Sequence, residues 1–314
     1  NLLAGNGDDF VIGGKGADLI DAGTDGGADI VLGDNGFAIF DNSNGSSLIR
    51  QIESDTPEEG DSDNITTGDG PDVVIAGSGH DVVDAGEDAS RDVLLGDNGL
   101  AIFDTDETVL EIHSLAPAIG GKDRLLARNS DDFVIGGREV DYIDAGTDGG
   151  TDIVVGDNGS ALFDNVNGSS LIRRIESSDP DQGHSDDILT GNGFDVVVAG
   201  SGSDIVDAGS DDSRDIILGD NGYAVFDALG NVDLAETTTP GTGGRDQISS
   251  IGGRNIILGG TDNDVITTGS GEDIVLGDNG RLEASGGWLT RIVSQDTAVG
   301  GADEGARALT HPFA

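Results

Sequence analysis

Short apolar runs recur along the chain, and an aspartate stands before most of them. Asp72, Asp81 and Asp92 open the runs Val-Val-Ile, Val-Val-Asp and Val-Leu-Leu, and Ala101 then opens Ile-Phe. The steps between these four positions are 9, 11 and 9 residues. Glycine-rich segments separate the runs; glycine permits turns with φ > 0, whereas β-branched residues favour strands. Each nonapeptide is therefore predicted to form a tight turn followed by a strand of three to four residues.

The same steps occur at three other places in the chain. They relate Asp9, Asp18, Asp29 and Ala38; Asp132, Asp141, Asp152 and Ala161; and Asp195, Asp204, Asp215 and Ala224. A further aspartate lies nine residues earlier in three of the four sets, at Asp63, Asp123 and Asp186. Five nonapeptides and one alternating segment, such as 47–53, then give six strands per set. If strands alternate between two sheets, six strands make three whole turns, which predicts that like loops stack above like loops.

Two longer periods organise these sets. The tetrapeptide Gly-Asp-Asn-Gly starts at Gly33, Gly96, Gly156, Gly219 and Gly277, and the sequence of 9–14 recurs at 132–137, an offset of 123 residues. The same offset relates 44–50 to 167–173. These periods predict paired units of about 60 residues: 1–62, 63–122, 123–185, 186–245 and 246–302, with a partial unit at 303–314.

The predicted fold is all-β, a single elongated parallel β-roll (a β-solenoid) over residues 1–314. We expect about 16 turns and, at about 4.8 Å per turn, a length of roughly 75–80 Å. The residue two after each opening position, as at Val74 and Val83, is predicted to point inward. The fifth such position predicts a phenylalanine ladder inside the roll, at Phe40, Phe103, Phe163 and Phe226.

The repeat is in progress at both ends of the sequence. Leu2-Leu3-Ala4 aligns with Leu125-Leu126-Ala127, and 298–303 matches 118–123 at the opening of another unit. The sequence contains no methionine. We therefore expect the chain to be a piece of a longer array with neighbours on both sides.

Composition narrows the class of protein. The 314 residues include 61 Asp plus Glu against 15 Lys plus Arg, a formal net charge of -46, so nucleic acid is excluded as a direct partner. No apolar run approaches the length of a membrane span, and no cysteine is present for disulfides or thiolate sites. A compact fold of this charge requires bound cations, because its carboxylates would otherwise repel one another.

The segment 13–21, Gly-Gly-Lys-Gly-Ala-Asp-Leu-Ile-Asp, fits the pattern Gly-Gly-x-Gly-x-Asp-x-apolar-x. Over nearly its whole length the chain resembles the RTX (repeats-in-toxin) family. That resemblance implies a parallel β-roll with multiple Ca²⁺ ions between successive loops on one edge, held by backbone carbonyls and Asp carboxylates. Calcium takes six to eight such oxygen ligands. The ligands that the resemblance implies are Asp9, Asp18, Asp72, Asp81, Asp132, Asp141, Asp195, Asp204, Asp264 and Asp273.

Several turns depart from the family pattern. Those that are two residues longer precede Asp29, Asp92, Asp152 and Asp215, and they contain the added residues Asp25, Asp88, Asp148 and Asp211. In the Gly-Asp-Asn-Gly turns the opening Asp becomes Ala and an acid appears within the turn, at Asp34, Asp97, Asp157, Asp220 and Asp278. We predict that all these aspartates are additional ligands, and that in the Gly-Asp-Asn-Gly turns the carboxylate has moved within the turn and has not been lost. Asn255 replaces an expected Asp and predicts a weaker or empty site.

Catalytic signals are weak. The four histidines form no His-Glu-x-x-His array, and Lys122 follows two glycines without the full P-loop spacing. We therefore expect no enzyme activity, but a calcium-rigidified structural segment of a large extracellular or cell-surface adhesin or matrix protein. Its candidate partners are calcium, other copies of itself end to end, and other surface or matrix components. The alternatives are a self-assembling calcium-dependent filament subunit and an accessory RTX module of a secreted enzyme; an ice-binding roll would need a more regular Thr array.

Overall fold

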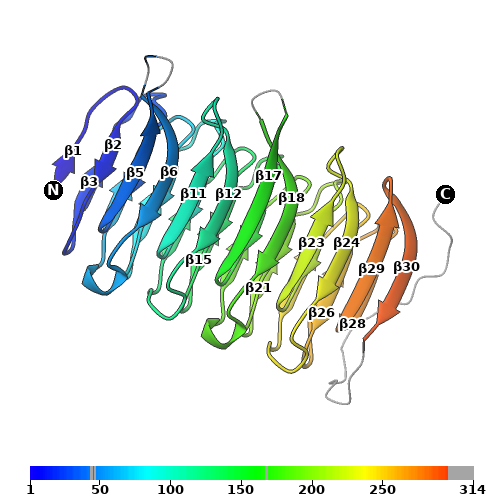
Figure 1. Cartoon of the computed structure of the whole chain (residues 1–314). Helices are drawn as coiled ribbons and strands as arrows, with labels where there is room; N and C mark the ends of the chain where they lie inside the picture. The colour runs from blue at the N-terminus through cyan, green and yellow to red at the C-terminus, as the bar shows by residue number, and fades with distance from the viewer. Residues whose placement is uncertain (43–44, 46, 167–168, 296–314) are drawn as a thin grey trace.

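Three ten-stranded sheets, stacked as layers, make up the molecule (Figure 1). The computed structural model describes residues 1–42, 45, 47–166 and 169–295. The predicted partial unit at 303–314 lies outside the described residues. Within them, no helix is long and apolar enough to cross a membrane.

Two of the sheets are parallel. Sheet A contains β1 (Leu2–Leu3), β3 (Leu19–Asp21), β7 (Asn64–Thr66), β9 (Val82–Asp84), β13 (Arg124–Leu126), β15 (Tyr142–Asp144), β19 (Asp187–Leu189), β21 (Ile205–Asp207), β25 (Gln247–Ser250) and β27 (Val265–Thr268). Sheet B contains β2 (Phe10–Ile12), β4 (Ile30–Leu32), β8 (Val73–Ile75), β10 (Val93–Leu95), β14 (Phe133–Ile135), β16 (Ile153–Val155), β20 (Val196–Val198), β22 (Ile216–Leu218), β26 (Ile256–Gly260) and β28 (Ile274–Asp278).

The third layer, which we call the hairpin sheet, is antiparallel. Its five hairpins are β5 (Gly36–Asp41) with β6 (Leu48–Ser54), β11 (Gly99–Phe103) with β12 (Val109–Ser114), β17 (Gly159–Val166) with β18 (Ser169–Ser177), β23 (Gly222–Phe226) with β24 (Val232–Thr237), and β29 (Gly280–Ser285) with β30 (Trp288–Ser294). Two 3₁₀ turns, Pro57–Glu59 and Pro180–Gln182, lie in the loops that return from hairpins to sheet A.

Sheet B is the middle layer, and most of its strands, such as β8 and β14, are buried on both faces. Val74 of β8 packs in a cluster with Val83 of sheet A, whereas Val73 packs in a second cluster with Phe103 and Ile112 of the hairpin sheet. All three residues of β8 are therefore buried, while in β9 only the central one is. Each aliphatic side chain buried in this way contributes about 1.5–3 kcal/mol relative to an exposed one.

The prediction of six strands per unit is confirmed, but the prediction that all six continue a two-sheet roll is wrong. Strands β11 and β12 are joined by only five residues, 104–108. A parallel connection needs a dozen or more residues, so a link this short can only close an antiparallel hairpin. Each unit thus makes two turns of parallel roll and one hairpin. The ten turns span roughly 45 Å at about 4.8 Å each, rather than 16 turns and 75–80 Å.

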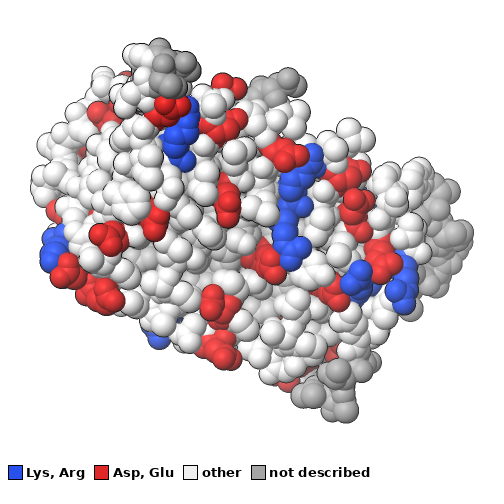
Figure 2. Space-filling view, in the orientation of Figure 1, with Lys and Arg blue, Asp and Glu red and all other residues white. Residues whose placement is uncertain are grey.

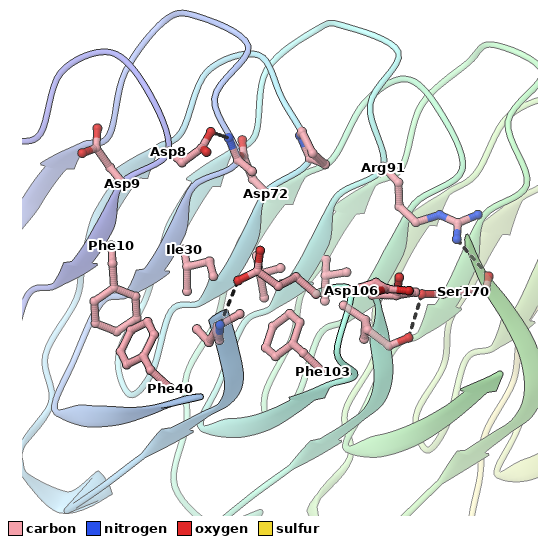
Figure 3. Close-up of a pocket in the computed structure, with 18 of the residues that line it drawn as sticks. Asp8, Asp9, Phe10, Ile30, Phe40, Asp72, Arg91, Phe103, Asp106 and Ser170 are labelled. Carbon is pink, nitrogen blue, oxygen red and sulfur yellow. Dashed lines mark hydrogen bonds between the residues drawn. The ribbon is translucent and has the colours of Figure 1, made fainter. Parts of the chain in front are cut away.

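The phenylalanine series points inward in part. Phe103, Phe163 and Phe226 are buried between sheet B and the hairpin sheet, but Phe40 is 42% exposed. No ladder forms among the described rings, because consecutive members lie two strands apart, about 10 Å. Each ring instead faces sheet B: Phe163 meets Phe133 edge-on at 5.3 Å between centroids, and Phe40 meets Phe10 at 5.7 Å (Figure 3).

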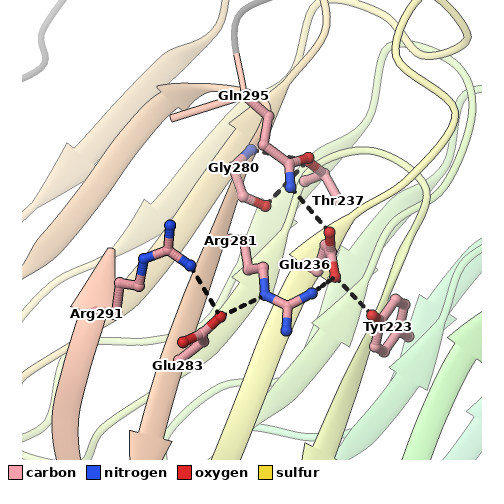
Figure 4. Close-up of polar contacts among 8 residues, drawn as sticks. All are labelled: Tyr223, Glu236, Thr237, Gly280, Arg281, Glu283, Arg291 and Gln295. Carbon is pink, nitrogen blue, oxygen red and sulfur yellow. Dashed lines mark hydrogen bonds and ion pairs between the residues drawn. The ribbon is translucent and has the colours of Figure 1, made fainter. Parts of the chain in front are cut away.

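The outward face of the hairpin sheet carries charges of both signs (Figure 2). Near its C-terminal end Glu236 accepts hydrogen bonds from the Tyr223 hydroxyl (2.6 Å) and the Arg281 guanidinium (2.9 Å), and Arg281 also donates to Glu283 (Figure 4). These strands are exposed on one face only, which explains their alternation of apolar and polar residues.

Candidate metal centre

Two stacks of aspartates follow the edges of the paired sheets A and B. The A ladder consists of the residue before each described sheet A strand from β3 onward: Asp18, Asp63, Asp81, Asp123, Asp141, Asp186, Asp204, Asp246 and Asp264. The B ladder consists of the residue before each sheet B strand: Asp9, Asp29, Asp72, Asp92, Asp132, Asp152, Asp195, Asp215, Asn255 and Asp273. The chain enters sheet A at one edge and sheet B at the other, so carboxylates line two edges and not the one edge predicted.

A repeated hydrogen bond builds each ladder. The backbone N–H of Asp81 donates to Oδ1 of Asp123 (2.8 Å), and the N–H of Asp123 donates to Oδ1 of Asp141 (2.7 Å). In the B ladder Asp92 donates to Oδ1 of Asp132 in the same way, at 2.8 Å. One carboxylate oxygen per residue is thereby used to join neighbouring turns, and the other remains for a ligand.

The second oxygen, Oδ2, is buried without a hydrogen-bond partner at most ladder positions. This holds for Asp9, Asp63, Asp72, Asp81, Asp123, Asp132, Asp141, Asp152, Asp186, Asp204 and Asp246. At two further positions a hydroxyl bonds this oxygen: Asp195 Oδ2 accepts from the Thr190 hydroxyl (2.9 Å) and Asp215 Oδ2 from the Ser250 hydroxyl (2.7 Å). A buried charge without a partner costs several kcal/mol, so a row of such oxygens fits a row of bound cations.

The raised pKa values of several ladder carboxyls also reflect carboxylates that are buried without a counter-charge. Burial raises the pKa of Asp81 to about 9 and that of Asp92 to about 10, and repulsion from the next ladder carboxylates, Asp123 and Asp132, adds to both shifts. Burial likewise raises the pKa of Asp63 and of Asp72 to about 7. Without a cation these groups therefore retain protons near neutral pH, and a divalent cation would replace those protons.

Backbone carbonyls lie beside the partnerless oxygens at the first glycine of four Gly-Asp-Asn-Gly turns, Gly33, Gly96, Gly156 and Gly219. A Cβ on Gly156 would lie 2.3 Å from the Ala199 carbonyl oxygen and 2.7 Å from Asp186 Oδ2. At Gly33 the corresponding atoms are the Ala76 carbonyl oxygen, at 2.2 Å, and Asp63 Oδ2, at 2.4 Å. The space that a side chain would occupy thus borders on carbonyl and carboxylate oxygens, the ligands that Ca²⁺ prefers.

Asn255 shows how a turn behaves when its ladder residue can donate. Its Oδ1 accepts from the Asp215 N–H (3.0 Å) as an aspartate would, but its Nδ2 donates to the carbonyls of Ser250 (3.1 Å) and Gly252 (2.6 Å). The turn carbonyls therefore converge on the end of the ladder side chain. An ionised aspartate cannot donate to them, whereas a cation can bind the carboxylate and the carbonyls together. A weaker or empty site at Asn255 stays a prediction.

The aspartates of the Gly-Asp-Asn-Gly turns have hydrogen-bond donors. Asp97 accepts from the backbone N–H groups of Gly121 (2.9 Å) and Arg138, and Asp157 from His184 (2.9 Å) and Ser201. Asp34 and Asp220 are bonded in the same manner. These carboxylates hold a hairpin return loop and the following turn in place; Asp278, in the last such turn, is half-buried. Their predicted role as calcium ligands stays a prediction.

The added aspartates of the longer turns lie beside the B ladder. Both oxygens of Asp25 accept from the Gly7 N–H (3.1 and 3.3 Å), and repulsion from Asp88 contributes to the raised pKa of Asp72 and of Asp92. Asp211 acts in the same direction on its ladder neighbours, as does Asp148. All four are half-buried or exposed, and their role as supplementary ligands also stays a prediction.

Sequence reasoning missed four ladder residues: Asp63, Asp123, Asp186 and Asp246. In the structure each hairpin leaves the roll, and the return loop after it supplies the next ladder residue. The signal was the nonapeptide step, since each of the four lies nine residues before a B-ladder position. Within the described ranges no three acidic or histidine side chains converge on one point, so a cation would need backbone carbonyls as well.

The comparison with protein families agrees with this geometry. The family model of the RTX calcium-binding nonapeptide repeat matches residues 3–37, 59–91, 118–149, 182–214, 191–223 and 249–281, more than half of the chain. The hairpins lie largely between the matched segments, which hold most strands of sheets A and B. None of the curated proteins compared with this chain matches it. The family is a structural calcium-binding repeat and not a catalytic one, and this chain, with its two aspartate ladders, belongs to the family of RTX calcium-binding nonapeptide repeats.

Proposed function

We propose that this chain is a calcium-stabilised structural segment of a large secreted or surface-attached adhesin or matrix protein. The observation that carries the proposal is the series of buried, partnerless Oδ2 atoms along both ladders. Calcium ions between successive turns would neutralise these carboxylates and join each turn to the next. The segment would then act as a rigid spacer without chemistry of its own.

The ladder residues are the proposed ligands, with Oδ2 of each aspartate and the carbonyls of the glycine-rich turns as donors. Asp123 and Asp186 are included on the same grounds as the predicted Asp81 and Asp141, because their carboxylates lie in the same ladder. Extracellular calcium modules bind at about 10⁻⁴–10⁻³ M, which suits a location outside the cell. In this proposal the chain folds where calcium becomes abundant, since binding and folding are coupled.

A calcium titration of the exhaustively chelated chain, followed by far-ultraviolet circular dichroism, tests the proposal. The β-signal should appear cooperatively with Ca²⁺ and not with equal Mg²⁺, which demands octahedral geometry and keeps its water. A chelated chain with full β-signal that calcium leaves unchanged would contradict the mechanism.

Sedimentation velocity of the calcium-saturated chain separates the structural roles. A single monomeric species of constant size supports the spacer. Assemblies that grow with protein concentration and dissolve on chelation would instead support the filament subunit.

A further inference from the structure

Arg91 and Arg214 occupy equivalent places, 123 residues apart, yet their neighbours differ. Each lies two residues before a sheet B strand, β10 and β22 respectively. On the adjoining strand the equivalent position holds Asp131 before β14 and Arg254 before β26. The register is the same in both cases, Val93 opposite Phe133 and Ile216 opposite Ile256. An acid beside an arginine in one half of the chain is thus replaced by a second arginine in the other half.

The first pair is fully bonded. The Arg91 guanidinium donates to the Asp131 carbonyl (2.7 Å) and lies 3.3 Å from the Asp131 carboxylate. It also donates to the Ser170 carbonyl at 2.9 Å, a contact visible in Figure 3. No unsatisfied charge remains at this place.

The second pair, Arg214 and Arg254, is not bonded in this way. Arg214 is half-buried and, within the part of the chain that the structure describes, makes no ion pair or hydrogen bond; its guanidinium only faces the Phe194 ring at 5.7 Å. Arg254 pairs weakly with Glu272 at 3.7 Å on the surface, where the two side chains are 60% and 53% exposed.

Both arginines line a cavity that bears the chain's only tryptophan. This cavity, about 90 Å³, lies between sheet B and the β29–β30 hairpin, and its other lining is mainly aliphatic, including Ile256, Ile274 and Leu282. None of the described residues that line it is acidic. Trp288 at its rim is 64% exposed. A more open hollow of about 460 Å³ adjoins it through the same two arginines, with Asp212 as its acidic member.

We propose that Arg214, Arg254 and Trp288 form a binding site for a small organic carboxylate. The two guanidiniums would take the carboxylate, as the planar fork of arginine does elsewhere, and the apolar part of the ligand would enter the cavity against the indole. The contrast with the net charge of -46 supports this assignment. Arg214, which has no ion pair among the described residues, and Arg254, which pairs only with the exposed Glu272, attract anions where the acidic surface around them repels them. Arg214 and Arg254 directly precede the B-ladder residues Asp215 and Asn255, but neither arginine is itself a ladder residue.

Tryptophan fluorescence of the calcium-saturated chain is a direct readout, because Trp288 is the sole tryptophan. Cyclohexanecarboxylate should change the emission saturably, with a Kd on the order of 1 mM for so small a ligand. Cyclohexylmethanol, the matched neutral compound, and inorganic sulfate should each bind at least about tenfold more weakly. The same titration is run with galacturonate and, as its neutral match, with galactose. Comparing galacturonate with cyclohexanecarboxylate shows whether the site prefers a sugar acid or an aliphatic acid.

Arg254→Asp introduces the residue type that stands at the equivalent position beside Arg91, and its carboxylate should pair with Arg214. Carboxylate binding should then weaken at least about tenfold, while the calcium-dependent β-signal is retained. Arg254→Gln serves as a second variant with the same expected loss. Arg91→Gln, at the bonded equivalent position, should leave binding unchanged. Equal binding of the alcohol and the carboxylate, equal binding of sulfate and the carboxylate, or undiminished binding by both Arg254 variants would overturn the proposal.

Discussion

At the scale of single residues, the two oxygens of most ladder aspartates have different roles. Oδ1 accepts a backbone N–H from the preceding turn, as between Asp92 and Asp132, and Oδ2 is left buried. The Oδ1 of Asn255 also accepts a backbone N–H, and its Nδ2 donates to a turn carbonyl. The ladder position therefore tolerates either a donor or an acid with a cation.

Exchanging asparagine and aspartate at a ladder position should add or remove one calcium site. Asn255→Asp removes the Nδ2 donor, so we expect about one more bound Ca²⁺ and a calcium-free chain that is less stable. Asp132→Asn, at the equivalent position one unit pair earlier, should do the opposite. Equilibrium dialysis gives the stoichiometry, and an unchanged count in both variants would remove this position from the calcium sites.

A second residue-scale prediction concerns the turn glycines. Gly156→Ala would place a Cβ within 2.3 Å of a carbonyl oxygen, so we expect a loss of about 2–4 kcal/mol in unfolding free energy. Gly149→Ala is the control, because no atom lies within 4 Å of its Cβ position. Denaturant unfolding at saturating calcium measures both variants, and equal stability would show that the turn has room to adjust.

At the scale of elements, the hairpins join consecutive units. Arg50 on β6 donates to the Asp104 carbonyl at the tip of the next hairpin, and Arg173 on β18 donates to the Asp227 carbonyl in the same way. The two tips are Asx-type turns in which Asp104 and Asp227 accept backbone N–H groups. Hairpins that carry the donating arginine therefore alternate here with hairpins whose tip carbonyl accepts, which gives a structural reason for the 123-residue offset.

A hydroxyl at the end of each hairpin bonds the start of the next one. The Gly222 N–H donates to the Ser177 hydroxyl at 2.9 Å, and the Gly280 N–H donates to the Thr237 hydroxyl at the same distance. Ser177→Ala leaves a donor without its partner and should cost about 1–2 kcal/mol. Ser177→Thr, which reproduces Thr237, should cost little. Thermal unfolding followed by circular dichroism compares them; equal losses would attribute the effect to packing and not to the hydroxyl.

At the scale of the whole molecule, the ladders set how stability depends on pH. Strands lie about 4.8 Å apart, so carboxylates repeat at that spacing along two edges. Their folded-state pKa values are raised, to about 7 at Asp63 and about 10 at Asp92, above the usual value near 3.9. A raised folded-state pKa stabilises the fold below the unfolded-state value, and this contribution is lost as pH rises through the folded-state values.

The calcium-free chain should therefore be more folded at pH 5 than at pH 8, and calcium should reverse that order because it displaces the protons. Circular dichroism at both pH values, with and without calcium, measures the effect. Sedimentation at pH 5 is the control for precipitation, since the sequence pI is about 4.1. A calcium-free β-signal that rises with pH would contradict the raised folded-state pKa values of the ladder aspartates.

The strands, their turns and most ladder residues were predictable because they depend on local periods. Nine residues make one turn and one strand, and the aspartate falls at the strand entrance whatever the strand pairs with, as at Asp72 and Asp81. Val-Val-Ile at 73–75 and Val-Val-Asp at 82–84 also differ in the sequence, since a strand covered on both faces is apolar throughout. Family membership likewise followed from the repeated motif.

Only the tertiary structure decided which sheet each strand joins. The nine-residue period predicts where a strand lies in the sequence, but not which strand it hydrogen-bonds to. Only antiparallel pairings such as that of β11 with β12 show that the hairpins form a third layer. That layer buries the outer face of sheet B, separates the phenylalanines and brings the return-loop residues Asp123 and Asp186 into the A ladder. The burial that leaves Oδ2 without a partner arises from turns stacked on turns 18 to 45 residues apart, a long-range contact that no local pattern encodes.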